Sequence, residues 1–263
     1  MRRLRRLVQK RALRWSEGVC VLEGPDLVAS ALAAGVEFEA IYVDAAQMSR
    51  QSFGELNESA ARHGVRVFSL GSGVLESVAD AATPQPVLAA VRLPVVEVEA
   101  IAAEGLVLVL HDVRDPGNAG TLVRSADAAG ATAVIFSGHS VDPCNPKTLR
   151  ATAGSIFHLP VAVGELEHTL ASFSSRGVAT YASIVRGGVD HRDIDYARAT
   201  IVVVGNEADG LDEEAIALCD GAISISMAGS SESLNAGVAG SLIAFEAMWR
   251  RQSTISRPPT PSL

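Results

Sequence analysis

The sequence predicts an α/β protein of two units, a small N-terminal one and a larger one built on an open parallel sheet with helices on both faces. Short apolar runs alternate with helix-like runs along most of the chain, an order typical of parallel strands joined by helices. The run LVLVL at residues 106–110 is continuously apolar, as expected of a strand buried on both faces. Residues 92–105 hold a proline, several acids and no clear period, so we place a linker there.

The first unit, residues 1–91, is predicted to be a small α/β domain. Pro25 suits the first turn of a helix and Gly35 suits its end. The predicted strands are 18–24, 40–43, 65–68 and 87–91, and the predicted helices are 25–35, 53–63 and 72–79.

The second unit, residues 106–250, continues the same alternation. Its predicted strands are 106–110, 132–136, 159–163, 178–182, 201–205 and 222–225. Its predicted helices are 118–129, 145–154, 165–175, 212–218 and 234–250. Residues 251–263 are polar and proline-rich, and we expect them to form a disordered tail.

The composition is that of a globular protein with a sizeable core, because 48% of the 263 residues are hydrophobic and 20% are charged. The formal net charge of −8 by itself disfavours a nucleic-acid partner. The charge is uneven, however, because seven basic residues and no acid lie within residues 1–14, whereas the other 15 basic residues face 30 acids. These seven are Arg2, Arg3, Arg5, Arg6, Lys10, Arg11 and Arg14. Such a basic arm could contact phosphates, or it could be a solvated helix start or a leader.

Nothing in the sequence predicts a membrane segment or a metal site. No apolar run is long enough to span a bilayer, and polar residues interrupt the segment that follows the basic start. Cys20, Cys144 and Cys219 lie far apart without metal-ligand spacing, as reduced thiols of a cytosolic protein do. We therefore expect a cytoplasmic protein that contacts no membrane and holds no metal.

Three polar, glycine-rich segments follow predicted strands of the second unit, where open α/β sheets bind ligands. The first, 111–130, opens a helix whose N-terminus suits an anion, although Asn118 could be a helix cap and Arg124 a surface charge. In the second, 201–215, Gly205 permits close approach of the backbone to a ligand. The third, 223–240, is rich in Ser and Gly and offers polar groups to a ligand, or forms a flexible linker. Neither a dinucleotide-binding fingerprint nor a P-loop is present.

Taken together, these segments resemble the three motifs of the SpoU branch of the SPOUT methyltransferases, the SpoU/TrmH type. The first motif is matched by Asn118, Gly120, Arg124 and Ala126, and the second by Gly205, Glu207 and Gly210. The third is matched by Ile225, Met227, Gly229, Ser233, Leu234 and Asn235. Ser226 replaces a common proline and Ala236 a common valine, and neither change removes a reacting group. LEGPDLVASAL (22–32) and TPQPVLAAV (83–91) more loosely resemble the small RNA-binding domain of the family.

The resemblance implies a methyltransferase that moves a methyl group from S-adenosylmethionine to a ribose 2′-hydroxyl, in ribosomal RNA rather than transfer RNA. It also implies a C-terminal trefoil knot and a homodimer whose interface helps to form the active site. The periodicity of the chain does not predict a knot.

The same resemblance implies the residues of the site. The catalytic candidates are Arg124, Asn118, Glu207, Ser233 and Asn235, and the cofactor-binding candidates are Gly205, Ile225, Met227, Leu234 and Asn235. The RNA-binding candidates are Arg2, Arg3, Arg5, Arg6, Lys10 and Arg11. Since a guanidinium stays protonated near neutral pH, either Arg124 clamps a neighbouring phosphate that takes the hydroxyl proton, or Arg124 is itself deprotonated in a special environment.

Two other functions remain open. One is a transfer RNA 2′-O-methyltransferase, and the other is a non-catalytic RNA-binding protein of the same fold. The presence of Arg124 and Asn235 counts against the second. An oxidoreductase is disfavoured by the missing fingerprint, and a small-molecule methyltransferase by the basic arm.

Overall fold

The computed structural model describes residues 1–78 and 84–255, and the chain divides into two compact units. Unit 1 comprises Met1–Pro94 and Asp142–His158, and unit 2 comprises Val95–Val141 and the chain from Leu159 onward. Residues 142–158, which we expected in the second unit, therefore cluster with the first.

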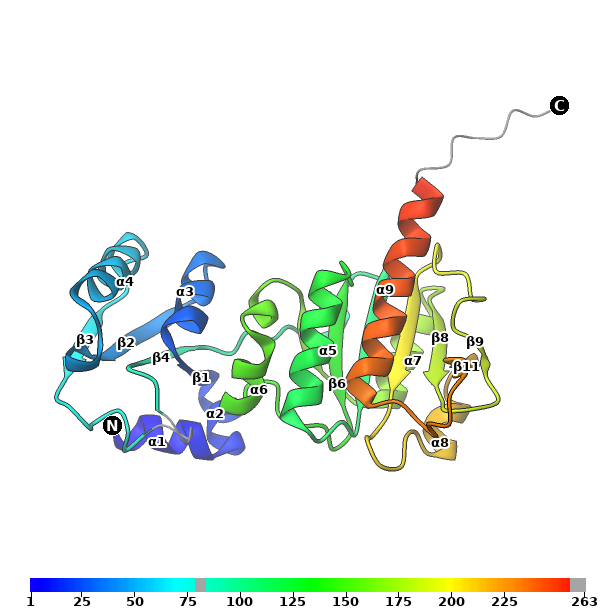
Figure 1. Ribbon diagram of the computed structural model, residues 1–263, viewed down its shortest axis with the longest axis horizontal. Helices are drawn as coiled ribbons and strands as arrows, with labels where there is room; N and C mark the ends of the chain where they lie inside the picture. Colours follow the sequence, from blue (N-terminus) through cyan, green and yellow to red (C-terminus); the bar gives the residue numbers. More distant parts are fainter. Residues whose placement is uncertain (79–83, 256–263) are drawn as a thin grey trace. The chain divides into compact units, whose positions relative to one another are not determined.

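Unit 1 is built on a four-stranded sheet of order β1-β4-β2-β3 (Figure 1). β4 pairs antiparallel with both β1 and β2, whereas β2 and β3 are parallel. The strands are β1 (Val19–Glu23), β2 (Phe38–Asp44), β3 (Val67–Leu70) and β4 (Val87–Arg92). The helices are α1 (Arg2–Gln9), α2 (Arg11–Glu17), α3 (Pro25–Ala33), α4 (Arg50–Arg62) and α6 (Pro146–Thr152). Two short 3₁₀ turns, η1 (Ala45–Gln47) and η3 (Ser155–Phe157), complete it.

The N-terminal segment is not a free arm but the helix start that its charge left open as an alternative. It forms α1 and α2, and Leu4, Leu7 and Val8 lie buried in the core of unit 1 against β1 and β4. These three side chains recur at the spacing of one helix face, so the apolar face of α1 is covered while its arginines face solvent. The burial of this apolar face holds α1 against the core of unit 1. The many basic residues around the face hid it in the sequence.

Arg14 belongs to the interior of unit 1, with 2% of its surface exposed. Its guanidinium donates to Asp142 Oδ2 at 2.6 Å and to the carbonyls of Leu7 and Val8 at 2.7 and 3.0 Å. Arg150 forms a second ion pair, with the buried carboxylate of Glu23 at 2.5 Å. A buried charge is tolerated when it is paired and hydrogen-bonded, so these contacts explain why residues 142–158 fold with unit 1.

Two further predictions of local structure are corrected. Residues 72–78 form successive turns and not the expected helix. Residue 79 of the predicted helix and Thr83 of the segment 83–91 lie outside the described residues. The expected tail is helical as far as Ile255, because α9 (Ala236–Ile255) continues into it. Residues 256–263 lie outside the described residues.

Unit 2 is built on a seven-stranded sheet of order β7-β6-β5-β10-β8-β11-β9, in which every neighbouring pair is parallel. The strands are β5 (Leu106–His111), β6 (Ala133–Ser137), β7 (Val161–Val163), β8 (Ala179–Ser183), β9 (Val189–Asp190), β10 (Thr200–Val204) and β11 (Gly221–Ser224). The remaining elements are α5 (Pro116–Ala128), α7 (Leu166–Ser174), α8 (Glu213–Ala217), α9 and the 3₁₀ turn η2 (Val98–Ala100). The predicted α/β fold with a parallel sheet is confirmed.

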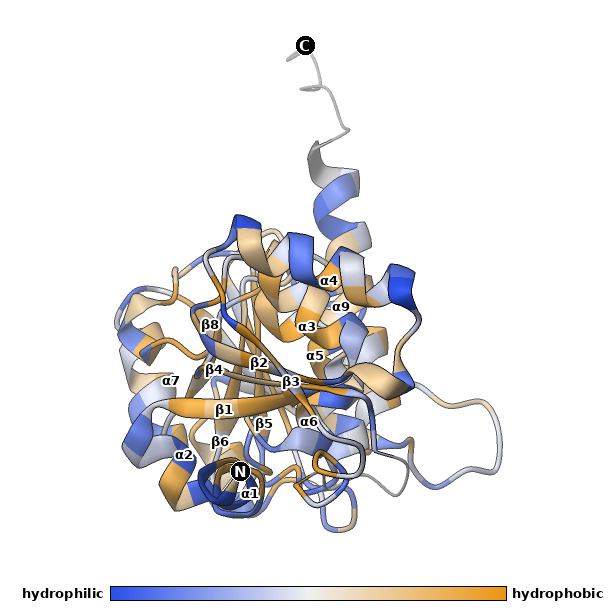
Figure 2. Cartoon of the chain, turned by 90° about the vertical axis from the view of Figure 1, so that its left-hand side faces the viewer, coloured by the Kyte–Doolittle hydropathy of each residue, from blue (hydrophilic) through white to orange (hydrophobic). Residues whose placement is uncertain are grey.

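Helices cover both faces of this sheet (Figure 2). Val107, Val109 and Ile201 share one apolar cluster with side chains of α7 and α8. On the other face α9 packs against α5, where Ser125 and Ser241 share a hydrogen bond of 2.7 Å. Such continuous burial on both faces is what the apolar strand sequences predict.

The order of the strands positions the functional site. The chain leaves β5 outward through β6 and β7, returns to β8, and only then inserts β10 between β5 and β8. Where the connections that follow two neighbouring strands run in opposite directions, a crevice forms at the carboxyl ends of the strands. Open α/β sheets bind ligands in such crevices. None of the helices in the described part of the chain has the length and hydropathy needed to cross a bilayer.

Candidate functional site

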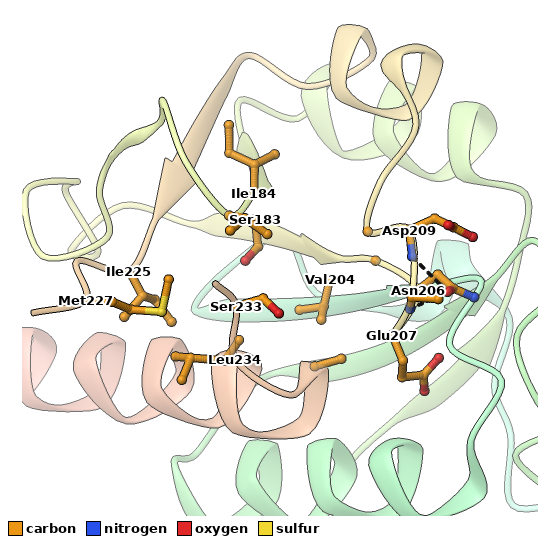
Figure 3. A pocket seen from close by; sticks show the side chains of 16 residues that line it. Ser183, Ile184, Val204, Asn206, Glu207, Asp209, Ile225, Met227, Ser233 and Leu234 are labelled. Atoms are coloured by element: carbon orange, nitrogen blue, oxygen red, sulfur yellow. Dashed lines mark hydrogen bonds between the residues drawn. The ribbon is translucent and has the colours of Figure 1, made fainter. Parts of the chain in front are cut away.

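A pocket that is partly open to solvent lies at the carboxyl ends of β8, β10 and β11 (Figure 3). It is lined by Ser183, Ile184, Val185, Val204, Gly205, Asn206, Glu207, Ala208, Asp209, Gly210, Ile225, Met227, Ser233, Leu234, Ala236 and Ala239. Apolar side chains, hydroxyls and backbone groups therefore face the same space.

Gly205 follows directly after β10 and lines this pocket, and its position requires the absence of a side chain. A Cβ atom there would lie 2.5 Å from the carbonyl carbon of Gly210 and 2.6 Å from the nitrogen of Leu211. Both are backbone atoms, which cannot move aside as a flexible side chain can. The turn from 205 to 210 therefore closes on itself, with its backbone against the pocket.

Asn206 holds that turn in shape. Its side-chain oxygen accepts from the backbone N–H of Ala208 at 2.8 Å, as in an Asx turn. Its side-chain nitrogen donates to the backbone carbonyl of Asp112 at 3.0 Å. Asp112 has a left-handed backbone with φ of 58°, which is uncommon for a residue other than glycine and directs its carbonyl toward the turn.

Asn118, Glu207 and Asn235 form one hydrogen-bonded chain, although they come from three different motifs. Asn235 Nδ2 donates to Asn118 Oδ1 at 2.9 Å, and Asn118 Nδ2 donates to Glu207 Oε1 at 3.0 Å. A carboxylate only accepts hydrogen bonds, so Glu207 fixes which end of the Asn118 amide it meets and leaves the amide oxygen for Asn235. We call these three residues the amide relay.

Glu207 is held as a carboxylate. Its partial burial favours the neutral form, but hydrogen bonds from Asn118 and from the backbone N–H groups of Asp115 and Arg114 outweigh that effect and lower the pKa of Glu207. The two backbone donors lie 3.2 and 3.3 Å from the carboxylate. Glu207 thus supplies internally the anion that we expected a ligand to bring to the start of α5.

The first turn of α5 is capped by Asp115, whose carboxylate accepts from the backbone N–H of Asn118 at 2.8 Å. Pro116 follows as the first helical residue. The alternative that Asn118 itself caps the helix is therefore wrong. Its side chain is left for the amide relay.

The structure brings most of the predicted site residues together. Gly205, Ile225, Met227, Ser233, Leu234 and Glu207 line the pocket, and Asn118 and Asn235 join it through the amide relay. Arg124 does not line the pocket. It is exposed on α5 and makes no hydrogen bond or ion pair with the residues that the structure describes.

One wall of the pocket, formed by Ser183, Ile184 and Val185 at the end of β8, was not predicted from the sequence. These residues carry no glycine or charge to mark them. The only signal available was their place, since the carboxyl end of a strand beside β10 must open on the same crevice. Within residues 1–78 and 84–255, no group of three or more His, Cys, Asp and Glu side chains could hold a metal ion.

The predicted RNA-binding residues of unit 1 fall into two classes. Arg3 is paired with Glu17 and Glu39 at 2.6 Å, and Arg5 donates to the carbonyl of Ser77 at 2.7 Å. The exposed members that make no contact with other described side chains are Arg2, Arg6, Lys10 and Arg11. Of the first class, Arg3 is neutralised by two carboxylates, whereas the second class has no ion pair among the described residues.

Both units match known families. Residues 105–245 match the SpoU rRNA Methylase family, and residues 1–89 match the MRM3-like substrate binding domain. The chain is 32% identical over 182 residues to the 23S rRNA (guanosine(2553)-2′-O)-methyltransferase RlmP of Bacillus subtilis, which covers 69% of this chain and 72% of that protein. It is 35% identical over 206 residues to the 23S rRNA (guanosine-2′-O-)-methyltransferase RlmB of Xanthomonas axonopodis, with 75% and 83% covered.

Solved structures agree over nearly the whole chain. The SpoU methyltransferase AviRb from Streptomyces viridochromogenes, in complex with the cofactor AdoMet, superposes with a TM-score of 0.83 and 28% identity over 96% of this chain and 98% of that one. The AdoMet-bound rRNA methyltransferase from Sinorhizobium meliloti gives a TM-score of 0.82 and 29% identity, with 94% and 92% covered. These matches confirm the predicted RNA methyltransferase and its cofactor, S-adenosylmethionine. The chain belongs to the SpoU rRNA methylase family.

Proposed function

We propose that this protein methylates the ribose 2′-hydroxyl of one nucleotide of 23S ribosomal RNA, in the cytoplasm. The observation that carries the proposal is the amide relay, which sets an ionised Glu207 and two oriented amides beside the pocket at the carboxyl ends of β8, β10 and β11. The names of the relatives RlmP and RlmB support the choice of this RNA.

S-adenosylmethionine suits the pocket by the groups that line it. Gly205 and its neighbours offer backbone donors and acceptors, and Ile225, Met227 and Leu234 offer apolar surface. Asn235 stands one residue beyond Leu234, at the start of α9, within the relay. When bound, the cofactor supplies an activated methyl group.

The residues of the chain would act by orientation and by handling one proton. A ribose hydroxyl becomes a good nucleophile only as its proton leaves, so oxygen and methyl group must be aligned while that proton is accepted. The amide relay and Ser233, which lines the pocket, are placed to orient the ribose. Glu207 is engaged by three hydrogen-bond donors, so it braces the relay.

Arg124 would clamp a phosphate of the RNA, which takes the hydroxyl proton. Its guanidinium has no partner among the described residues, and a planar fork binds phosphate through two bonds at once. The alternative, in which Arg124 is itself deprotonated, requires an environment that withdraws its charge.

A second copy of the chain would complete the site, since Arg124 does not reach the pocket. α9 carries an exposed apolar stripe of Val238, Leu242 and Trp249, with 47%, 43% and 53% of their surfaces exposed. Apolar side chains that recur on one helix face suit the self-complementary contact of a homodimer. Trp249→Glu is expected to shift the chain from dimer to monomer in sedimentation velocity, and an unchanged mass would contradict this arrangement. The proposal also includes the C-terminal trefoil knot that the family resemblance implies.

Unit 1 would position the RNA, a role that the MRM3-like substrate binding domain match supports. The free cations Arg2, Arg6, Lys10 and Arg11 would contact phosphates, which fix the position of the RNA without reading its sequence. The deletion of residues 2–14 is a poor test, because it would also remove the core side chains of α1.

The test is transfer of tritiated methyl groups from S-adenosylmethionine to protein-free 23S rRNA and, separately, to bulk transfer RNA. We expect label in the ribosomal RNA at one site. Label in transfer RNA alone would favour the transfer RNA enzyme. Absence of label from both RNAs and from assembled large subunits, with the cofactor bound, would favour a non-catalytic RNA-binding protein.

A further inference from the structure

A second pocket, of about 610 Å³, adjoins the cofactor pocket of unit 2 and shares Val185, Ile225 and Met227 with it. Its other lining residues are Arg186, Gly187, Ser224, Ser226, Gly229 and Ser231. We call the two pockets together the extended groove. None of the family motifs includes Arg186.

Charge is separated along the extended groove. Glu207 and Asp209 lie at one end of the first pocket, and Ile225 and Met227 lie at the other (Figure 3). The second pocket continues from Ile225 and Met227, so Arg186 lies at the end away from the two acids. It is the one cation among the described residues that line the groove.

The guanidinium of Arg186 is free to meet a ligand. It is exposed, and it forms no ion pair or hydrogen bond within residues 1–78 and 84–255. Every other group around it in the second pocket is apolar, backbone or a serine hydroxyl. The hydroxyls of Ser224, Ser226 and Ser231 already donate their single protons within the chain, to the carbonyl of Gly188, the carboxylate of Asp190 and the carbonyl of Ser233. Among the side chains that line the second pocket, Arg186 is therefore the donor that remains for an anion.

The turn that carries Arg186 is held at both ends by β11. The backbone N–H of Ile184 donates to the carbonyl of Ile223 at 2.9 Å, and Ser224 Oγ donates to the carbonyl of Gly188 at 3.2 Å. A Cβ at Gly188 would lie 2.6 Å from the carbonyl carbon of Ile223, so this backbone packs directly on the strand. Arg186 therefore projects from a fixed turn, which reduces the entropy lost on binding.

We infer that Arg186 binds a carboxylate or phosphate oxygen of a ligand that extends beyond the first pocket. This inference rests on the proposed function, which provides two sources of such an oxyanion: the carboxylate of S-adenosylmethionine and a phosphate of the RNA. A guanidinium pairs with either group through charge-assisted hydrogen bonds.

The test compares Arg186→Gln with Arg198→Gln in the full-length protein. Arg198 is exposed and unpaired among the described side chains. It lies just before the amino-terminal end of β10, away from the carboxyl ends of the strands, and it lines neither pocket of the groove. Three equilibrium dissociation constants are measured: for S-adenosylmethionine, for 5′-methylthioadenosine, which lacks the amino-acid part, and for 23S rRNA across a range of salt.

If the anion is the carboxylate, Arg186→Gln weakens binding of S-adenosylmethionine by about tenfold and leaves binding of 5′-methylthioadenosine unchanged. If it is a phosphate, both nucleoside affinities are unchanged, RNA binding weakens, and the slope of log affinity against log salt falls by about 0.7 to 0.9. Arg186→Lys keeps the positive charge, so we expect it to retain a large part of the affinity that Arg186→Gln loses.

Equal behaviour of Arg186→Gln and Arg198→Gln toward all three ligands would overturn the inference. Binding is measured without turnover, so the comparison holds even if the wild-type chain transfers no methyl group. A wild-type chain that transfers no methyl group would contradict the proposed function and not the role of Arg186.

Discussion

Asn118→Ala tests the amide relay at its centre. The substitution removes two hydrogen bonds, one to the carboxylate of Glu207 at 3.0 Å and one from Asn235 at 2.9 Å. A hydrogen bond to a charged group contributes about 1.5 kcal/mol at the low end of its range, which suits an exposed carboxylate, and a neutral one contributes about 1 kcal/mol. If both are needed in the transition state, the barrier rises by about 2.5 kcal/mol and kcat falls by roughly 70-fold.

Asn118→Asp separates the relay from a mere loss of packing. The new carboxylate has nearly the shape of asparagine and can still accept from Asn235, but it places a second negative charge against Glu207. We therefore expect Asn118→Asp to be less active than Asn118→Ala, despite its closer shape.

The assay is steady-state transfer of tritiated methyl groups, with kcat and KM determined separately and thermal unfolding recorded for each variant. Thr121→Ala, at an exposed position of the same helix, is the control. Activity of Asn118→Asp equal to or above that of Asn118→Ala would refute the reasoning. The double variant with Asn235→Ala should lose less than the product of the two single losses, because both act through one chain of bonds.

Three further predictions follow from the site and from unit 1. The lowered folded-state pKa of Glu207 means that its ionised form stabilises the fold above about pH 4.3 and that this contribution disappears as the pH falls through the folded pKa. The Tm difference between wild type and Glu207→Gln should be constant at neutral pH and vanish in acid, and a difference that grows in acid would contradict the sign. Gly205→Ala should weaken S-adenosylmethionine binding by at least about tenfold in calorimetry, since 1.4 kcal/mol of strain suffices for that change, whereas Gly229→Ala, with open space around its Cβ, should not. Changing the four free cations of unit 1 to Gln should lower the salt dependence of RNA binding, with an unchanged slope excluding them as phosphate contacts; these are Arg2, Arg6, Lys10 and Arg11.

The central strands β5 and β10 of unit 2 were predictable because each is a continuous apolar run, whereas the two-residue edge strand β9 (Val189–Asp190) was not predicted. LVLVL and IVVV are β-branched or leucine sequences that only a doubly covered sheet accommodates, and they became β5 and β10. The three motifs lie at the carboxyl ends of strands of one parallel sheet. Because these ends meet at the same side of the sheet, the motifs were expected to lie close together.

Long-range pairing was not predictable from the sequence. Nothing local shows that β10 inserts between β5 and β8, or that Arg14 pairs with Asp142 across 128 positions and draws residues 142–158 into unit 1. The helix expected at 72–79 failed for a local reason, since Gly71 and Gly73 favour turns over a helix start.

The segment Arg2–Gln9 shows how composition can mislead. Its density of arginine predicted a basic arm, with a solvated helix start as an alternative, whereas Leu4, Leu7 and Val8 carry the helical spacing that buries one face. In the site, Arg124 was predicted from its motif, but its isolation on α5 appears only in the structure.

The most direct measurement is the identity of the methylated nucleoside. After reaction with 23S rRNA, nuclease digestion and mass spectrometry should reveal one 2′-O-methylated nucleoside, in a dinucleotide that alkali does not cleave, and Asn118→Ala should reduce its yield. A methyl group on a base, or a product that alkali cleaves fully, would contradict the central claim that this site activates a ribose hydroxyl.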